Sequence, residues 1–483
     1  MLVLLNKLQS VNERPAEFVI DRDYTFFTPL DILATFLGVA VIYVLLYVRR
    51  RQNNEIEHYK YYLPAFSFKM LFVIANAMFY IIAYGAGGDS IGYWDTAVKL
   101  NHLFWKDPFL YFQELLTTPE YLGHLKNFDA STGYPDAKMY EEPPSFFVAK
   151  ITSIFTFFTF KGYILMSLIF AFITTNASWR LYELLRSFKL HSDWHLALAI
   201  FFIPSLSFWC GGISKDTVMW VAVCYFLYNI YQLISPDKKS SFWNWIGMIL
   251  CLYVMFRVRS FMIVTVIVPL LFAYSARLGK KFGPKSLERL GIRILIGILG
   301  VGGILVFFQT PIAEEFINEA AVINYDMTTN KTYGSNRYDL GITDYSPFGM
   351  IMAFPASVIA GFYRPFIWES LSVSLILNGI ESLVLMYFTF RFFVSWKVGE
   401  RIKFIRNHEF LIYAFFFALI LAYFAGFTSI LFGVLVRFKA PVLPFLVIVL
   451  TAHYLEENGK RKLETGENPV DESGSLDELG DSQ

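Results

Sequence analysis

Residues 29–51, PLDILATFLGVAVIYVLLYVRRR, decide the fold class of this chain. Residues 29–48 contain one charged side chain, Asp31, and about 20 apolar residues suffice for a helix that crosses a bilayer. Three consecutive arginines, Arg49–Arg51, follow directly. Because basic loops stay on the cytoplasmic side of a membrane, the stretch predicts a span whose N-terminal end lies outside.

The whole chain shares this apolar character. Of its 483 residues, 55% are hydrophobic and 17% are charged, and the mean hydropathy is +0.46. This composition excludes an ordinary soluble globule. The formal net charge is +1 and no basic domain occurs, so no nucleic-acid partner is expected.

The alternation of basic and weakly charged loops predicts an all-α polytopic membrane protein. We expect about eleven transmembrane helices (10–13), with the N-terminus outside and the C-terminus in the cytoplasm. The spans fall at residues 29–48, 62–85, 162–184, 194–210, 217–234, 241–256, 260–276, 293–308, 371–390, 409–427 and 439–455. The basic cytoplasmic markers are Arg49–Arg51, Arg186 and Lys189, Lys238 and Lys239, Arg277–Arg293, Arg391–Arg406 and Lys460–Lys462.

This threading divides the chain into three parts: an external segment 1–28, a transmembrane domain 29–458 and an acidic cytoplasmic tail 459–483. The tail is nearly free of large apolar residues, as is typical of disordered segments. Two long external loops are expected, 86–161 and 309–370. Their apolar stretches 144–160 and 349–363 are interpreted as interfacial or re-entrant helices, because two further crossings would force the basic loop 277–293 outside.

A few charged residues lie beside apolar helix ends on the predicted outer side. They are Asp89, Lys215, Asp216, Arg257, Arg259, Arg364, Glu369, Arg437 and Lys439. Arginines on this side run against the usual charge bias. Two explanations remain open: pairing with acids or lipid headgroups, and a site for a lipid phosphate, which guanidinium groups bind with two parallel hydrogen bonds.

Asp89 lies in GGDSIGYWDTAVKL, where the second span emerges. The glycines allow a sharp turn, so Asp89 begins a helix that carries Tyr93 and Ala97 on the same face. A helix N-cap explains an aspartate here, and an aspartate at a helix start also points into the aqueous mouth of the bundle. Lys215 and Asp216 lie at the tip of a helical hairpin that turns at Gly211–Gly212, where a mutual ion pair is the alternative to ligand binding.

The three cysteines, Cys210, Cys224 and Cys251, lie in apolar runs. They indicate neither a disulfide framework nor a metal site. No cofactor is expected, and a divalent metal stays open.

Residues 86–190 resemble the GT-C superfamily of membrane glycosyltransferases, which use lipid-linked sugars. Asp89, Tyr93 and Ala97 fit its D-x3-Y-x3-A pattern, and EPPSFFVAKITSIFTFFTFKGY with the later Trp179-Arg180-Leu181 is similar to its proline-led helix and Arg-Leu pair. The usual acidic neighbour of the catalytic Asp is Ser90 here. The chain is also similar to bacterial surface-polysaccharide membrane proteins, including the O-antigen polymerase type. The stretches that carry this similarity are PSLSFWCGGISKDT, RPFIWES and VRFKAPVLPF.

The resemblance implies transfer of a sugar or glycan from a polyprenyl phosphate or diphosphate at the outer face of a bacterial cytoplasmic (inner) membrane. Asp89 would be the general base, supported by Tyr93, Asp216 and Glu369. Lys215, Arg257, Arg259, Arg364, Arg437 and Lys439 would bind the lipid phosphate. The alternatives are a non-enzymatic flippase or exporter of the same lipid-linked glycan, and a scaffold subunit of a surface-polymer machine. The partners expected are this lipid-linked glycan and membrane lipid, and the sequence gives no oligomeric state.

The predicted sidedness can be measured by cysteine labelling in intact cells. A membrane-impermeant thiol reagent should label a cysteine placed at Lys331 and should not label one at Lys285. The unsubstituted chain, whose cysteines lie in apolar runs, is the control. Labelling at Lys285, or none at Lys331, would overturn the topology.

Overall fold

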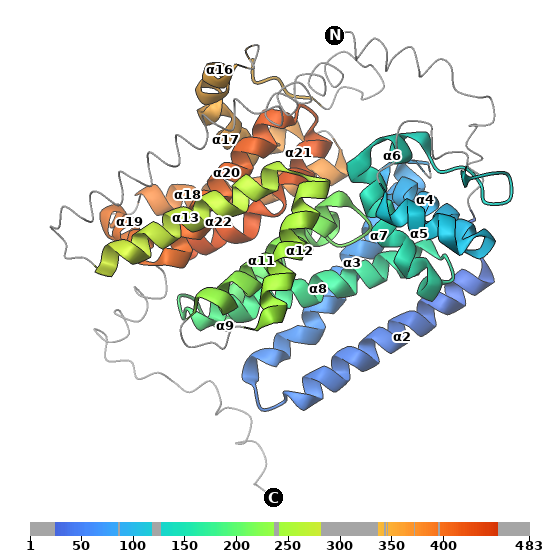
Figure 1. Cartoon of the computed structure of the whole chain (residues 1–483). Helices are drawn as coiled ribbons and strands as arrows, with labels where there is room; N and C mark the ends of the chain where they lie inside the picture. Colours follow the sequence, from blue (N-terminus) through green and yellow to red (C-terminus); the bar gives the residue numbers. More distant parts are fainter. Residues whose placement is uncertain are drawn as a thin grey trace, which may run out of the picture.

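The computed structural model shows a helical protein (Figure 1). It describes residues 25–85, 87–117, 127–235, 241–281, 337–341, 344, 346–370, 372–394 and 397–452. Within these ranges there is no sheet, only an isolated antiparallel bridge between Arg337 and Leu431. The all-α prediction is therefore confirmed for the part of the chain that the structure describes.

Six helical stretches in the described residues are long and apolar enough to cross a membrane. They are Pro29–Gln52 (α2), Glu57–Ala83 (η2 Glu57–Tyr61, α3 Tyr62–Met78 and η3 Phe79–Ala83), Tyr163–Ser187 (α8), Lys215–Ile234 (α11), Leu375–Val394 within α18 (Val373–Val394) and Glu409–Thr428 (α20). The pair α21 (Phe432–Lys439) and α22 (Val442–Thr451), bent by 57°, makes a seventh if it forms one span. These helices indicate an integral membrane protein.

The remaining expected spans are shorter or interrupted. Residues 194–210 form two helices, α9 (Asp193–Phe201) and α10 (Pro204–Trp209), because Ile203 precedes a proline and adopts an extended conformation. The helix α12 (Phe242–Val258) has 17 residues, and the apolar part of α13 (Phe261–Lys281) is also short. Residues 293–308 lie outside the described residues, so the count of eleven stays a prediction.

Shorter helices occupy the expected outer loops. After the second span come α4 (Asp89–Lys106), α5 (Pro108–Leu116), α6 (Ala137–Glu141) and α7 (Pro143–Thr159), which gather together in Figure 1. The expected stretch 144–160 is α7, which packs on α4. The expected stretch 349–363 is divided between α16 (Pro347–Met352) and α17 (Phe354–Tyr363), followed by η6 (Ile367–Glu369).

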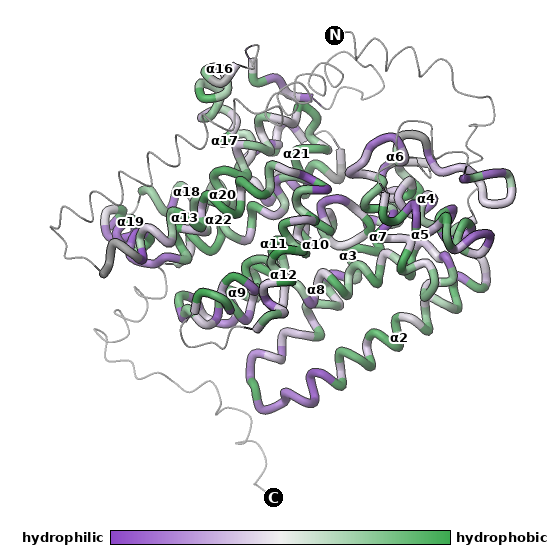
Figure 2. The backbone as a smooth tube through the Cα atoms, viewed as in Figure 1, coloured by the Kyte–Doolittle hydropathy of each residue, from purple (hydrophilic) through white to green (hydrophobic). Residues whose placement is uncertain are grey.

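Basic residues gather at one end of the bundle. Arg186, near the end of α8, lies 3.5 Å from the His58 ring, which follows the Arg49–Arg51 end of α2. Phe188 stacks on Phe410 with 5.1 Å between ring centroids, which brings the end of α8 to the start of α20 and the basic helix α19 (Val398–Asn407) before it. Figure 2 shows these hydrophilic helix ends and the hydrophobic lengths between them.

Helix α11 joins this end to the opposite one. Near its C-terminal end, the Tyr231 hydroxyl lies 3.0 Å from the Ser187 hydroxyl. Lys215 and Asp216 are the first two residues of α11, and the helix has 20 residues in all, which at 1.5 Å per residue is about one bilayer thickness. The basic clusters and the Lys215–Asp216 pair are therefore at opposite ends of the described bundle.

Small residues allow α17 and α20 to pack closely. Ser357 and Gly361 on α17 face Ala422 and Gly426 on α20, with the four-residue spacing of small-residue helix contacts. A Cβ atom added at Gly426 would lie 1.9 Å from the Ser357 carbonyl oxygen, and one added at Gly361 would lie 2.0 Å from that of Ala422. Both obstacles are backbone atoms, so the helices would have to separate.

Gly426→Ala should therefore destabilise the protein by about 1–3 kcal/mol, the usual cost of overpacking. Thermal unfolding of the purified protein in detergent measures the effect. Gly399→Ala on α19 is the matched control, because nothing lies within 4 Å of the added Cβ and alanine favours helix over glycine. Equal unfolding temperatures for the two variants would contradict the close packing.

Candidate functional site

A tight turn places Asp89 at the first position of α4. The second span ends in η3, and Gly85 (φ 56°) and Gly88 (φ 84°) then adopt the left-handed conformation that glycine tolerates. Gly88 occupies the N-cap position, with no side-chain cap. The helix start is confirmed, whereas the N-cap role considered for Asp89 is wrong, because Asp89 lies one residue inside the helix.

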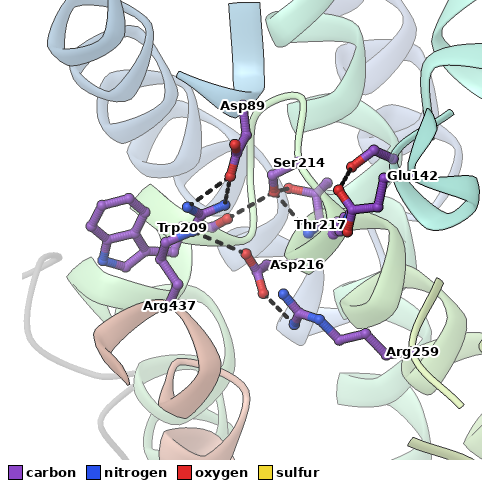
Figure 3. A network of polar contacts seen from close by, with 10 residues as sticks. Asp89, Glu142, Trp209, Ser214, Asp216, Thr217, Arg259 and Arg437 are labelled. Atoms are coloured by element: carbon purple, nitrogen blue, oxygen red, sulfur yellow. Dashed lines mark hydrogen bonds and ion pairs between the residues drawn. The ribbon is translucent and has the colours of Figure 1, made fainter. Parts of the chain in front are cut away.

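The Asp89 carboxylate binds an arginine from the far end of the chain (Figure 3). Arg437, on α21, donates from Nη1 and Nη2 to Oδ2 of Asp89, each at 3.3 Å. The donor and the acceptor are both charged, and hydrogen bonds between charged groups are about twice as strong as neutral ones. This contact joins the start of α4, which follows the second span, to α21 near the end of the described chain.

The same guanidinium also holds Asp216, the second residue of α11. Arg437 Nε lies 3.3 Å from Oδ2 of Asp216, and Arg259 Nη1 lies 2.6 Å from Oδ1. The exposed side-chain fraction separates the two acids: it is 1% for Asp216 and 32% for Asp89. Of these two acids, Asp89 is the one that is open to the surroundings, and Asp216 is the buried anchor of both arginines.

Aromatic rings cover the two guanidinium groups. Arg437 lies over the Trp209 ring at 5.8 Å and Arg259 over the Phe438 ring at 3.9 Å. Cation–π contacts in sites shielded from water contribute up to about 2 kcal/mol each. The rings thus fix the orientation of both arginines towards Asp216.

Lys215 pairs with Glu142 instead of with its neighbour Asp216, so the mutual ion pair considered as the alternative to ligand binding is not formed. Lys215 Nζ lies 2.6 Å from Oε1 of Glu142, and the Ser145 hydroxyl donates to Oε2 at 2.5 Å. Burial opposes ionisation of this carboxyl, but Lys215 and Ser145 outweigh it and lower the pKa of Glu142. Sequence reasoning missed Glu142, although an acid directly before Pro143-Pro144 at a helix start was a signal.

The turn before α11 depends on small residues. Ser214 caps the helix by accepting a hydrogen bond from the Thr217 backbone N–H at 3.1 Å. A Cβ atom added at Gly211 would lie 2.4 Å from the Ser207 carbonyl oxygen and equally close to Val73. The chain therefore passes close to α10 and α3 here, and this passage sets the position of Asp216.

Two of the expected phosphate-site residues, Arg364 and Lys439, form a second polar cluster with Glu369, which was expected to support the base. Arg364 Nη2 lies 3.3 Å from Glu369, and the fully buried Lys439 donates to the Arg364 carbonyl at 2.9 Å and to the Ser382 hydroxyl at 2.7 Å. Arg437 and Lys439 are two residues apart on α21, and residues at this spacing face different sides of a helix. Arg364, Glu369 and Lys439 therefore do not join the network around Asp89.

Arg257 and Tyr93 flank the network in different ways. Arg257 lies over the Phe147 ring of α7 at 5.7 Å. Tyr93 is buried on α4, one turn after Asp89, and burial together with the Asp89 charge raises the pKa of its phenol well above 10. Tyr93 is thus a neutral group at physiological pH.

Within the residues that the structure describes, no group of three or more His, Cys, Asp or Glu side chains is arranged to hold a metal ion. Comparison with known proteins finds no matching family model, no similar curated protein and no similar solved structure. What the site does is therefore argued from its residues.

Replacing the buried anchor should unbalance the network. Asp216→Ala leaves Arg259 and Arg437 without their shared acid, and removal of one partner from a buried ion pair costs roughly 3–5 kcal/mol. Thermal unfolding in detergent measures the loss. The control is Glu57→Ala, which breaks an exposed pair with Lys60 and should change nothing measurable. An Asp216→Ala variant as stable as that control would contradict the anchoring role.

Proposed function

We propose that this protein transfers a sugar or glycan from a polyprenyl phosphate or diphosphate to an acceptor hydroxyl, with Asp89 as the general base. One observation carries the proposal. A carboxylate with 32% of its side chain exposed stands at the end of an apolar helical bundle, held by Arg437, which joins it to Asp216 and Arg259. The resemblance to GT-C glycosyltransferases at Asp89, Tyr93 and Ala97 supports the same reaction.

The reaction needs one acid and nearby cations. The acceptor oxygen attacks the anomeric carbon, the bond from that carbon to the phosphate oxygen breaks, and its electron pair leaves with the phosphate. Asp89 takes the acceptor proton, and the neighbouring cations stabilise the charge on the departing phosphate. Arg437 contributes to both steps, because it orients Asp89 and carries positive charge to the same place.

The cations of the site suit an anionic substrate. Three acids of the site, Asp89, Glu142 and Asp216, are matched by three cations, Lys215, Arg259 and Arg437. Arg257 lies at the end of α12. Guanidinium and ammonium groups are the usual ligands of phosphate in proteins, so this set of side chains favours a phosphate group.

An exporter of the same lipid-linked glycan is the second candidate. The observation that favours it is the ion pair itself, since an aspartate that only balances Arg437 needs no chemical role. In an exporter Asp89 would serve the structure alone. The distinction therefore requires an assay of sugar attachment, because loss of transport and loss of transfer both follow from a collapsed network.

Asp89→Asn should lower transfer by about 10²–10⁴-fold, the usual contribution of a general base. Purified protein is incubated with a lipid-linked sugar and an acceptor, and chromatography of the extracted lipid follows the sugar's attachment. The amide keeps the size and shape of the side chain but cannot take the proton.

Asp107→Asn is the matched control, because Asp107 caps α5 and asparagine caps about as well as aspartate. Both variants should remain folded, because Arg437 keeps Asp216 as its partner when Asp89 is replaced, and thermal unfolding in detergent verifies this. Unchanged transfer by a stable Asp89→Asn variant would refute the base assignment. Movement of the lipid between leaflets by the unsubstituted protein, with no new sugar linkage, would favour the exporter.

A further inference from the structure

An apolar groove of about 310 Å³ lies between α7, α8, α11 and α12. Its walls include Ile151 and Phe155 of α7, Val221 of α11, and Leu250 and Val254 of α12. Leu250 is 57% exposed. The groove therefore opens on the outer surface of the bundle, which faces lipid in a membrane protein.

The groove begins at the polar network. Thr217 lines it and directly follows Asp216 on α11, and its hydroxyl lies 2.9 Å from that of Ser214. From Thr217 the lining runs along α11 to Asn229. At 1.5 Å per residue this is about 18 Å, or more than half of the roughly 30 Å hydrocarbon core.

Arg257 stands at the same end of the groove. It lies three residues after the wall residue Val254 on α12, and its guanidinium lies over Phe147, four residues before the wall residue Ile151 on α7. Residues three or four apart share one face of a helix. The stripes of α7 and α12 that line the groove therefore lead to Arg257.

We propose that this groove holds the first isoprene units of a prenyl phosphate, with its phosphate between Arg257 and the network around Asp89. A ligand with one charged end and one long apolar chain matches a cationic mouth that opens into an apolar groove. An open side towards lipid lets the rest of a long chain leave the bundle. The choice of an isoprenoid over a straight acyl chain rests on the proposed function.

The test uses the full-length protein in nanodiscs and farnesyl monophosphate that carries a diazirine on its last isoprene unit. After irradiation, mass spectrometry should find the label on α7, α8, α11 or α12. Val221→Phe fills the groove and should lower labelling by about tenfold, a loss that corresponds to about 1.4 kcal/mol. Leu71→Phe is the control, since Leu71 is 62% exposed on α3 and outside the groove.

A second variant examines the headgroup. Arg257→Gln should weaken labelling, whereas Arg50→Gln at the basic end of α2 should not. Label on other helices, or equal labelling of Val221→Phe and Leu71→Phe, would overturn the proposal that the groove binds the prenyl chain, even if Asp89 proves to be the base. Equal competition by dodecyl phosphate and by unlabelled farnesyl phosphate would overturn the isoprenoid assignment. Conversely, groove labelling with full transfer by Asp89→Asn would refute the proposed function and keep the groove.

Discussion

Arg437 bridges two carboxylates that belong to different parts of the chain, and the arrangement of this end of the bundle depends on that bridge. Two of its nitrogens reach Asp89 and a third reaches Asp216, which also binds Arg259. Removing charges from water is costly, and only good geometry with several hydrogen bonds compensates for it. Since each member balances another, α4, α11, α12 and α21 can hold their charged groups here only together. The bridge is thus a constraint on packing as much as a part of the site.

The bridge also gives two identical side chains different roles. Asp216 is 1% exposed and contacts both arginines, so its charge is fully used within the protein. Asp89 contacts the same Arg437 from the open side and keeps 32% of its side chain exposed. The difference comes from position: Asp216 is the second residue of α11, which packs on α7, α8 and α12, whereas Asp89 begins α4, which packs on α5, α6 and α7. In the proposed reaction a substrate would therefore meet Asp89, whose orientation is fixed by Arg437, and Arg437 is in turn held by Asp216.

The sequence predicted the helical class, and it predicted from the sparse charges of one membrane face that Arg259 and Arg437 would lie near Asp89. The structure places Arg437 against Asp89 and Arg259 against the neighbouring Asp216. It could not predict that Arg364 and Lys439 form a separate cluster, since this depends on how α21 is rotated about its axis. Glu142 was missed because its partner Lys215 is 73 residues away: the acid before Pro143-Pro144 marks a helix start, but nothing in the sequence marks its pairing with Lys215. The break between α9 and α10 at Ile203 is caused by Pro204. The expected span 194–210 was drawn from hydrophobicity alone, which does not register the proline.

The second cluster still affects the first, through the short helix α10. Glu381 of α18 accepts hydrogen bonds from the backbone N–H of Ser205, at 2.9 Å, and from its hydroxyl. At the other end of α10, Trp209 lies beside the Arg437 guanidinium. Lys439 ties α21 to the same α18 through Ser382. Helix α18 therefore helps to position both the Trp209 ring, through α10, and Arg437, through α21. Residues that do not touch Asp89 thus influence where its partner Arg437 lies.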